Sequence, residues 1–108
     1  MQNLQNLQHK QLFVIEADYT SQKPRRIAKM KVLYYDGRNF KPVIQTRLQV
    51  VSLINNSGFE VYTATLDSKN KLQHGAEVIA YPIDKEWFLK TIPNDTPEDN
   101  LGELPSIS

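Results

Sequence analysis

The segment TRLQVVSLINNSG, residues 46–58, decides the fold because it carries a complete set of helix signals. Thr46 and Gln49 have capping-box spacing, in which the threonine hydroxyl accepts from the glutamine amide and the glutamine side chain reaches back. The apolar residues that fall within half a turn of the helical wheel are Val50, Val51, Leu53 and Ile54. Gly58 supplies the left-handed residue at which helices end. We expect a helix of about three turns here, buried along most of its circumference.

The segments on both sides of this helix are rich in β-branched and aromatic residues, which predicts strands. Before the helix, residues 12–19 form a first predicted strand, and residues 26–35 form a second that leads into Asp36-Gly37. Asp-Gly between two such segments is a strong signal for a two-residue hairpin turn. After the helix, the predicted strands are residues 59–66, 76–83 and 87–91.

A two-residue turn at Asp36-Gly37 fixes the pairing of the predicted hairpin. It pairs Tyr35 with Arg38, Leu33 with Phe40, and Lys31 with Pro42. The face that we expect to point to the core then consists of Ala28, Met30, Val32, Tyr34 and Val43. The opposite face carries Lys29, Lys31, Tyr35 and Arg38 around Leu33 and Phe40. Because proline cannot donate to a ladder, Pro42 indicates that its strand lies on an edge of the sheet.

The predicted order of elements is strand, hairpin, helix and three-strand meander. This order is typical of an α+β fold, with one amphipathic helix packed on a mainly antiparallel sheet of five to six strands. A chain of 108 residues has the size of a single domain. We expect a flexible lead-in over residues 1–11, the α+β domain over residues 12–105, and a free C-terminus over residues 106–108.

The C-terminal stretch is acidic and rich in proline, but its local chemistry predicts a docked turn. Thr96 is a suitable N-cap, Pro97 suits the first helical position, and Gly102 can end the turn. Leu101 and Leu104, three residues apart, would give the turn two apolar anchors. We therefore expect this segment to pack on the domain.

The ending DNLGELP, residues 99–105, resembles the C-terminus of a family of small bacterial domains of unknown function. The resemblance extends to the helix ending at Gly58, to residues 61–65 and to residues 75–78, and it covers roughly residues 27–105. It implies a bacterial, cytoplasmic protein, and it carries no activity, cofactor or catalytic residue to this chain.

The composition argues against catalysis and against metal binding. The chain has no cysteine, which excludes thiolate metal sites and cysteine nucleophiles. Its two histidines, His9 and His74, have no second ligand at metal-binding spacing, and the sequence contains neither a phosphate-binding loop nor a nucleophile elbow. No apolar segment approaches the roughly 20 residues of a membrane span. We expect a cytoplasmic protein without enzymatic activity, cofactor or metal.

The charges are sorted along the chain and suggest one candidate surface. Up to Ile54 there are nine Lys and Arg against three Asp and Glu, whereas from Asn55 onward there are four against nine. The candidate nucleic-acid or partner face consists of Arg25, Arg26, Lys29, Lys31, Tyr35, Arg38 and Phe40. Cations presented together bind phosphates, and the two aromatic side chains would stack on unpaired bases.

The near-zero net charge weighs against nucleic acid, since domains that bind it are usually strongly basic. The acidic half of the chain can instead screen the basic hairpin, or the helix can cover this face. Our main hypothesis is a non-catalytic interaction module whose partner is another protein or a second copy paired through an edge strand. A nucleic-acid-binding accessory protein is the alternative.

Overall fold

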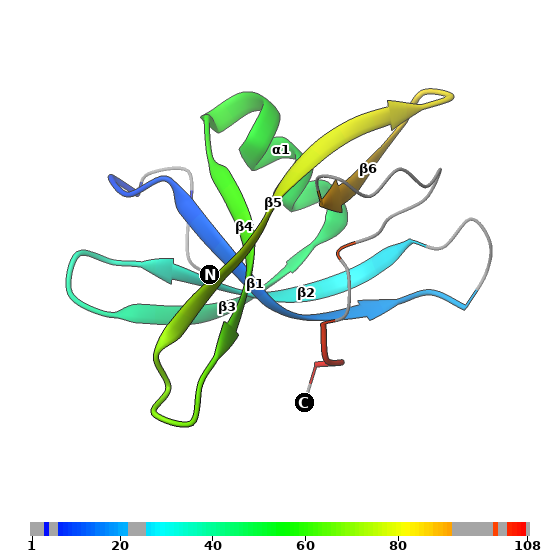
Figure 1. The fold of residues 1–108 in the computed structure, drawn as a ribbon. Coiled ribbons are helices and arrows are strands. Elements are labelled where there is room, and N and C mark those ends of the chain that lie inside the picture. The colour runs from blue at the N-terminus through cyan, green and yellow to red at the C-terminus, as the bar shows by residue number, and fades with distance from the viewer. Residues whose placement is uncertain (1–3, 5–6, 22–25, 92–100, 102–103, 108) are drawn as a thin grey trace.

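Six strands and one helix make up the part of the chain that the computed structural model describes, which is residues 4, 7–21, 26–91, 101 and 104–107. The elements are β1 (Gln11–Tyr19), β2 (Ile27–Tyr35), β3 (Phe40–Thr46), α1 (Arg47–Ser57), β4 (Glu60–Leu66), β5 (Leu72–Ile83) and β6 (Glu86–Thr91) (Figure 1). They form one sheet of order β3-β2-β1-β4-β5-β6. All neighbours are antiparallel except β1 and β4, which are parallel. The α+β prediction is confirmed.

Both ends of α1 are formed by the residues that the sequence indicates. The Thr46 hydroxyl accepts a hydrogen bond from the Gln49 amide at 3.2 Å, and the Gln49 side chain accepts one from the Thr46 amide at 2.8 Å. Gly58 ends the helix with φ +71°. The exposed side of α1 is wider than predicted, since Leu48 is 59% exposed. The helix packs on the sheet with one face and leaves the other at the surface of the molecule.

The predicted pairing of the first hairpin is wrong by two residues. The observed pairs are Tyr35 with Phe40, Leu33 with Pro42, and Lys31 with Ile44. The loop has four residues because the Asp36 carboxylate accepts hydrogen bonds from the amides of Arg38 and Asn39, both at 2.8 Å. Gly37 has φ +104°, whereas Asp36 keeps a negative φ. A shift of two preserves the alternation of faces, so β3 still lies on the edge with Val43 towards the helix side.

The main core lies between the sheet and α1. Met30, Val32 and Tyr34 of β2 are buried in it, as predicted, and Val43 packs against it. Ala28 was expected in this core and is exposed. The reason is a register shift: Tyr19 pairs with Ile27 while Asp18 pairs with Lys29, so β2 has one unpaired residue at Ala28 that breaks the alternation.

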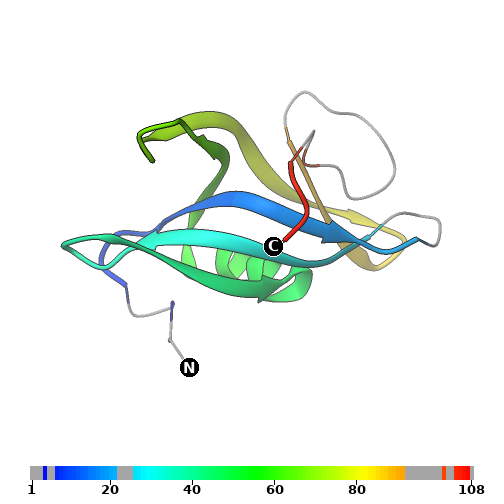
Figure 2. The ribbon, with the colours of Figure 1, turned by 90° about the horizontal axis from the view of Figure 1, so that it is seen from below.

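A smaller core lies on the face of the sheet opposite α1. It consists of the buried residues Phe13, Leu33 and Ala64, with Ile15, Tyr62 and Leu72 packed around them. Residues 64–74, part of the β4–β5 hairpin, lie over this face, and we call them the β4–β5 arm. Figure 2 shows the arm on the side of the β1–β2–β3 layer opposite α1. The arm begins at a register shift where Gly75 comes so close to Thr63 that an added Cβ would lie 2.2 Å from the Thr63 hydroxyl.

Strands β1 and β4 pair over only four residues each, Gln11–Val14 with Glu60–Thr63. Beyond this short contact the C-terminal segment takes the place of β4, since the Pro105 carbonyl accepts a hydrogen bond from the Ala17 amide at 2.9 Å. Leu101 is buried and Leu104 packs on the main core, so both predicted anchors are confirmed. The turn predicted around Thr96, Pro97 and Gly102 lies outside the described residues.

Residues of the predicted lead-in and of the predicted free C-terminus also contact the domain. Leu4 is buried in the main core and Leu7 packs against it, although both belong to the predicted lead-in. At the other end, the Ile107 amide donates a hydrogen bond of 3.0 Å to the Asp18 carboxylate. The core is therefore closed by residues from both ends of the described chain.

Candidate ligand-binding groove

Those cations of the predicted basic face that the structure describes are not gathered into one patch. Arg25 lies outside the described residues. Arg26 forms an ion pair with Glu86, and Lys31 forms one with Glu16 at 3.5 Å. Acidic residues therefore neutralise Arg26 and Lys31, two of the cations that were expected to bind phosphate.

The other members of the predicted face separate into two groups. Lys29 and Arg38 are exposed, at opposite ends of the hairpin. Tyr35 and Phe40 are cross-strand neighbours, with ring centroids 5.2 Å apart. The two aromatic residues of the predicted face thus lie together, whereas its exposed cations Lys29 and Arg38 lie apart.

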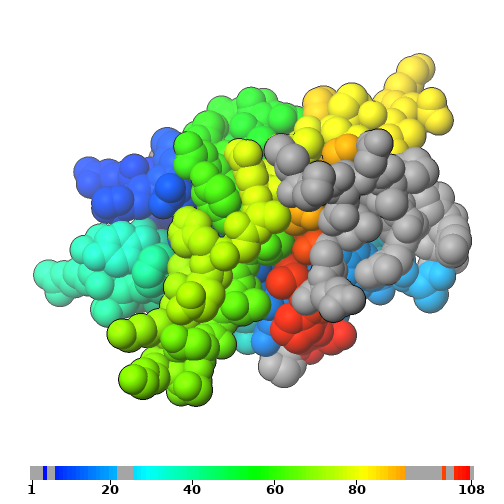
Figure 3. All heavy atoms as spheres, in the orientation of Figure 1, coloured from blue at the N-terminus to red at the C-terminus, as the bar shows by residue number. Residues whose placement is uncertain are grey.

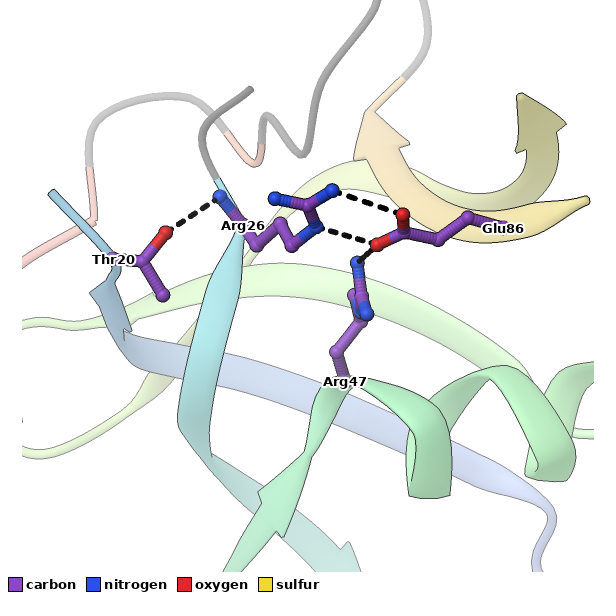
Figure 4. A network of polar contacts seen from close by, with 4 residues as sticks. All are labelled: Thr20, Arg26, Arg47 and Glu86. Atoms are coloured by element: carbon purple, nitrogen blue, oxygen red, sulfur yellow. Dashed lines mark hydrogen bonds and ion pairs between the residues drawn. The ribbon is translucent and has the colours of Figure 1, made fainter. Parts of the chain in front are cut away.

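Arg26 belongs to a polar network at the N-terminal end of α1, which Figure 4 shows from close by. Its guanidinium donates two hydrogen bonds to Glu86, at 2.5 and 2.9 Å, and Arg47 donates a third at 2.8 Å. Both guanidiniums also lie over the ring of Phe88, at 5.7 and 5.3 Å from its centroid. The Thr20 hydroxyl accepts from the Arg26 amide and fixes the start of β2. This network holds β2, α1 and β6 together.

The hydrogen bonds from Arg26 and then from Arg47 lower the pKa of Glu86 from 4.5 to about 2. The carboxylate is therefore ionised at neutral pH. Its charge also compensates for Arg47, whose cation in the first turn of α1 opposes the helix dipole. We assign this network to the stability of the fold, because its charged groups are hydrogen-bonded to one another.

Six aromatic rings form a continuous series on the face opposite α1. Phe13 contacts Phe40, His74 and Tyr62, with centroid distances of 5.8, 4.9 and 6.0 Å. The series is extended by contacts of Tyr35 with Phe40 and with His9, the latter at 5.1 Å. These rings come from β1, β2, β3, β4, β5 and the segment before β1.

An open groove of about 400 Å³ lies along this series of rings. Its lining residues are His9, Gln11, Phe13, Tyr35, Phe40, Leu72 and His74. Phe13 is only 4% exposed and forms the floor, whereas Phe40 is 47% exposed and stands at the rim. Figure 3 shows the surrounding segments on one side of the molecule: the β2–β3 hairpin in cyan and teal, the N-terminal residues in blue, and the β4–β5 arm in green. We call this site the aromatic groove.

Two polar side chains near the floor of the aromatic groove are held by hydrogen bonds to one carboxylate. The Tyr62 hydroxyl donates a hydrogen bond of 3.1 Å to Glu60, and Gln11 donates one of 3.3 Å to the same carboxylate. The hydrogen bond to Glu60 raises the pKa of Tyr62 above its usual value. The tyrosine is therefore a neutral donor that orients its ring against Phe13, where the two rings stack at an interplanar angle of 25°.

The described segments contain neither a cluster of metal ligands nor a helix able to span a membrane. No group of three His, Asp or Glu side chains there lies close enough to hold a metal ion. None of the helices described has the length and apolar character needed to cross a bilayer.

A known family matches most of the chain. The model of DUF3892, described as a protein of unknown function, matches residues 14–105. The chain belongs to the DUF3892 family. The match begins within β1, so the DUF3892 region extends further towards the N-terminus than the resemblance we drew from residue 27. Searches of curated proteins and of solved structures found no match.

The aromatic groove combines residues inside and outside the DUF3892 match. Tyr35, Phe40, Leu72 and His74 lie within residues 14–105, whereas His9, Gln11 and Phe13 precede them. Sequence reasoning identified Tyr35 and Phe40 and missed the others. Little in the sequence indicated these residues, because His9 and His74 are isolated in it. His74 reaches Phe13 where the chain passes close to Thr63 at Gly75.

Proposed function

We propose that this DUF3892 chain is a small non-catalytic binding module of the bacterial cytoplasm, and that it holds its partner in the aromatic groove. The observation that carries the proposal is the groove itself, where five of seven lining residues bear rings and Phe40 is 47% exposed. Apolar rings that remain uncovered in a concave surface are the usual lining of binding sites.

The lining of the groove supports binding rather than catalysis. It contains no carboxylate, amine, hydroxyl nucleophile or thiol other than the phenol of Tyr35. Within the described segments, no hydrogen bond links the imidazole of His9 or His74 to a carboxylate. General acid–base catalysis by histidine requires such an orienting partner and a second reacting group.

The free edge of β3 is poorly suited to pairing with another strand, which favours the groove as the contact surface. Pro42 has no N–H, and in an edge strand the missing donor faces outward. The outward carbonyl of Ile44 accepts from the Gln45 side chain at 3.0 Å, and the Thr46 amide donates to Gln49. At the alternate edge positions 42, 44 and 46, one backbone donor is missing, one carbonyl is occupied and one amide is occupied. We place the partner against side chains of the groove, in preference to a second copy paired through β3.

Two exposed apolar residues provide a matched test. Phe40 lies at the rim of the groove, whereas Leu48 lies on α1 at the opposite face of the sheet and is also exposed. We expect the wild-type chain and Leu48→Ala to recover the same partner from a bacterial lysate, as protein or extracted small molecule. Phe40→Ala should recover about tenfold less, because it removes one of the aromatic rings that line the groove.

Equal recovery by Phe40→Ala, measured on protein with an unchanged circular dichroism spectrum, would overturn the groove as the binding surface. A concentration-dependent dimer that persists in Phe40→Ala would support edge pairing instead. Salt-sensitive recovery of nucleic acid that is lost on charge reversal of Arg26 and Lys29 would support the phosphate-binding alternative.

A further inference from the structure

We infer that the ligand of the aromatic groove is an uncharged planar aromatic molecule of one or two fused rings with polar atoms on its edge. This inference rests on the proposed function, because it names the chemical class that the same groove takes. The size of the groove sets the first limit: about 400 Å³ lies near the lower end of small-molecule sites, which span roughly 300–1,000 Å³.

The angles between the rings indicate a ring-shaped occupant. Phe13 meets Phe40 at 78° and His74 at 68°, and His9 meets Tyr35 at 77°. Because these rings are steeply inclined to one another, some turn a face and others an edge towards the aromatic groove. Another ring can then stack on one neighbour while it meets a second edge to face, and both arrangements are favourable. An aliphatic group gains only apolar contact there.

The charges around the groove indicate a neutral occupant. Its lining contains no Asp, Glu, Lys or Arg, so a buried charge on the ligand would have no partner. On the flanking strands, Lys31 and Lys41 are paired with Glu16 and Asp36 at 3.5 and 3.2 Å. These lysines are already neutralised by the protein and do not form an anion site.

Three lining side chains can recognise the edge of such a ring. His9, Gln11 and His74 carry nitrogen and oxygen atoms that donate or accept hydrogen bonds. Small-molecule sites typically combine an apolar lining with a few polar groups of this kind that fix the orientation of the ligand. The aromatic groove has this composition, which matches a heteroaromatic or hydroxylated ring.

Two matched pairs of probes test this class on the full chain. Phenol and cyclohexanol share size and hydroxyl but differ in aromaticity. Adenine and adenosine monophosphate share a base, to which the second adds a ribose and an ionised phosphate. We expect phenol and adenine to bind with dissociation constants on the order of 1 mM in ¹H–¹⁵N shift titrations. The largest shifts should fall in residues 9–13, 35–40 and 72–74. Cyclohexanol should bind roughly 2- to 10-fold more weakly than phenol.

Substitutions at Phe40 separate the ring from its apolar volume. Phe40→Leu keeps an apolar side chain and removes the ring, so it should weaken phenol by about fivefold and leave cyclohexanol unchanged. Leu48→Ala should change neither affinity. Equal binding of phenol and cyclohexanol, or adenosine monophosphate binding more than about tenfold tighter than adenine, would overturn the inferred class.

The two proposals fail in different ways. If no aromatic probe binds but recovery from lysate still depends on Phe40, the groove remains a binding surface and the ligand class is wrong. If phenol binds Phe40→Ala as tightly as the wild type, and lysate recovery is also unchanged, both proposals fail.

Discussion

Arg47, the first residue of α1, donates a hydrogen bond of 2.8 Å to Glu86, the first residue of β6. Arg26, just before β2, binds the same carboxylate. Three elements that are distant in the sequence therefore meet at one side chain. The contact also explains how a helix that starts with a cation and has no acidic residue in its first turn is accommodated, since the negative charge comes from another strand.

Glu86→Gln should lower the thermal midpoint at neutral pH, because two guanidiniums lose their ionised partner. The pKa of Glu86 is held at about 2 in the folded chain against an ordinary 4.5. The stabilisation is therefore fully present above about pH 4.5 and is lost as the pH falls towards 2. Thermal unfolding from pH 7 to 2 should show the two chains converging at low pH.

The exposed Glu77 provides the control for this substitution, because Glu77→Gln should leave the acid profile unchanged. Asp36 contributes in the same range, since the amides of Asn39 and Arg38 and then Lys41 hold its pKa at about 2. Glu86→Gln should therefore reduce the acid sensitivity, and adding Asp36→Asn should reduce it further. A constant offset between Glu86→Gln and the wild type across the whole range would contradict an ionised Glu86.

Deletion of Arg38 and Asn39 should leave the hairpin folded. It would connect Tyr35 to Phe40 by Asp36-Gly37 alone, which is the favoured two-residue turn, and it keeps the observed pairing. We expect the free energy of unfolding in urea to stay within about 1 kcal/mol of wild type, because a shorter loop offsets the lost carboxylate contacts. Nuclear Overhauser contacts between Tyr35 and Phe40 should persist, and their loss would show that the four-residue loop sets the register.

Gly75→Ala should destabilise the chain by about 1–3 kcal/mol, as for other overpacked positions. The added Cβ would lie 2.2 Å from the Thr63 hydroxyl and 2.8 Å from its backbone oxygen. Combining it with Thr63→Ala removes the hydroxyl but leaves the backbone contact, so rescue should be partial. Urea unfolding of the single and double variants measures this, and a neutral Gly75→Ala would mean that the β4–β5 arm can shift without cost.

Leu101→Ala should cost about 2–5 kcal/mol, the range for a buried leucine. Its side chain is 2% exposed in the main core, and its amide donates to the Tyr19 hydroxyl at 3.0 Å. Leu104→Ala, at a half-buried position, is the matched comparison and should cost less. Tyr19→Phe should cost about 1 kcal/mol by removing the acceptor. Equal effects of the two leucine substitutions would argue against a specific site for Leu101.

The parts of the fold that follow from neighbouring residues could be predicted from the sequence. The cap at Thr46 and Gln49 and the end of α1 at Gly58 depend on groups within one turn, and all three are confirmed. In these places the competing conformations are few, so propensity decides the outcome.

The register of the first hairpin and the parallel strand pair could not be predicted. At Asp36 the side chain competes with the backbone for the same amides, and the pattern Asp-Gly alone does not show which interaction is stronger. The pairing of β1 with β4 joins residues 49 positions apart, and its four pairs leave no repeated pattern in the sequence. The aromatic groove depends on both features, which is why only Tyr35 and Phe40 were found.

The hydrogen bond between Ala17 and Pro105 has a consequence for synthesis. During translation β1 is made early, yet the backbone group that completes its outer half arrives 88 residues later. Until Pro105 has left the ribosomal exit tunnel, that half of β1 presents an unpaired donor, and nascent chains on one messenger can pair through such strands. The outer half of β1 can therefore be completed only after the segment that holds Pro105 has been made, so slow translation between β6 and Pro105 would prolong exposure of this edge.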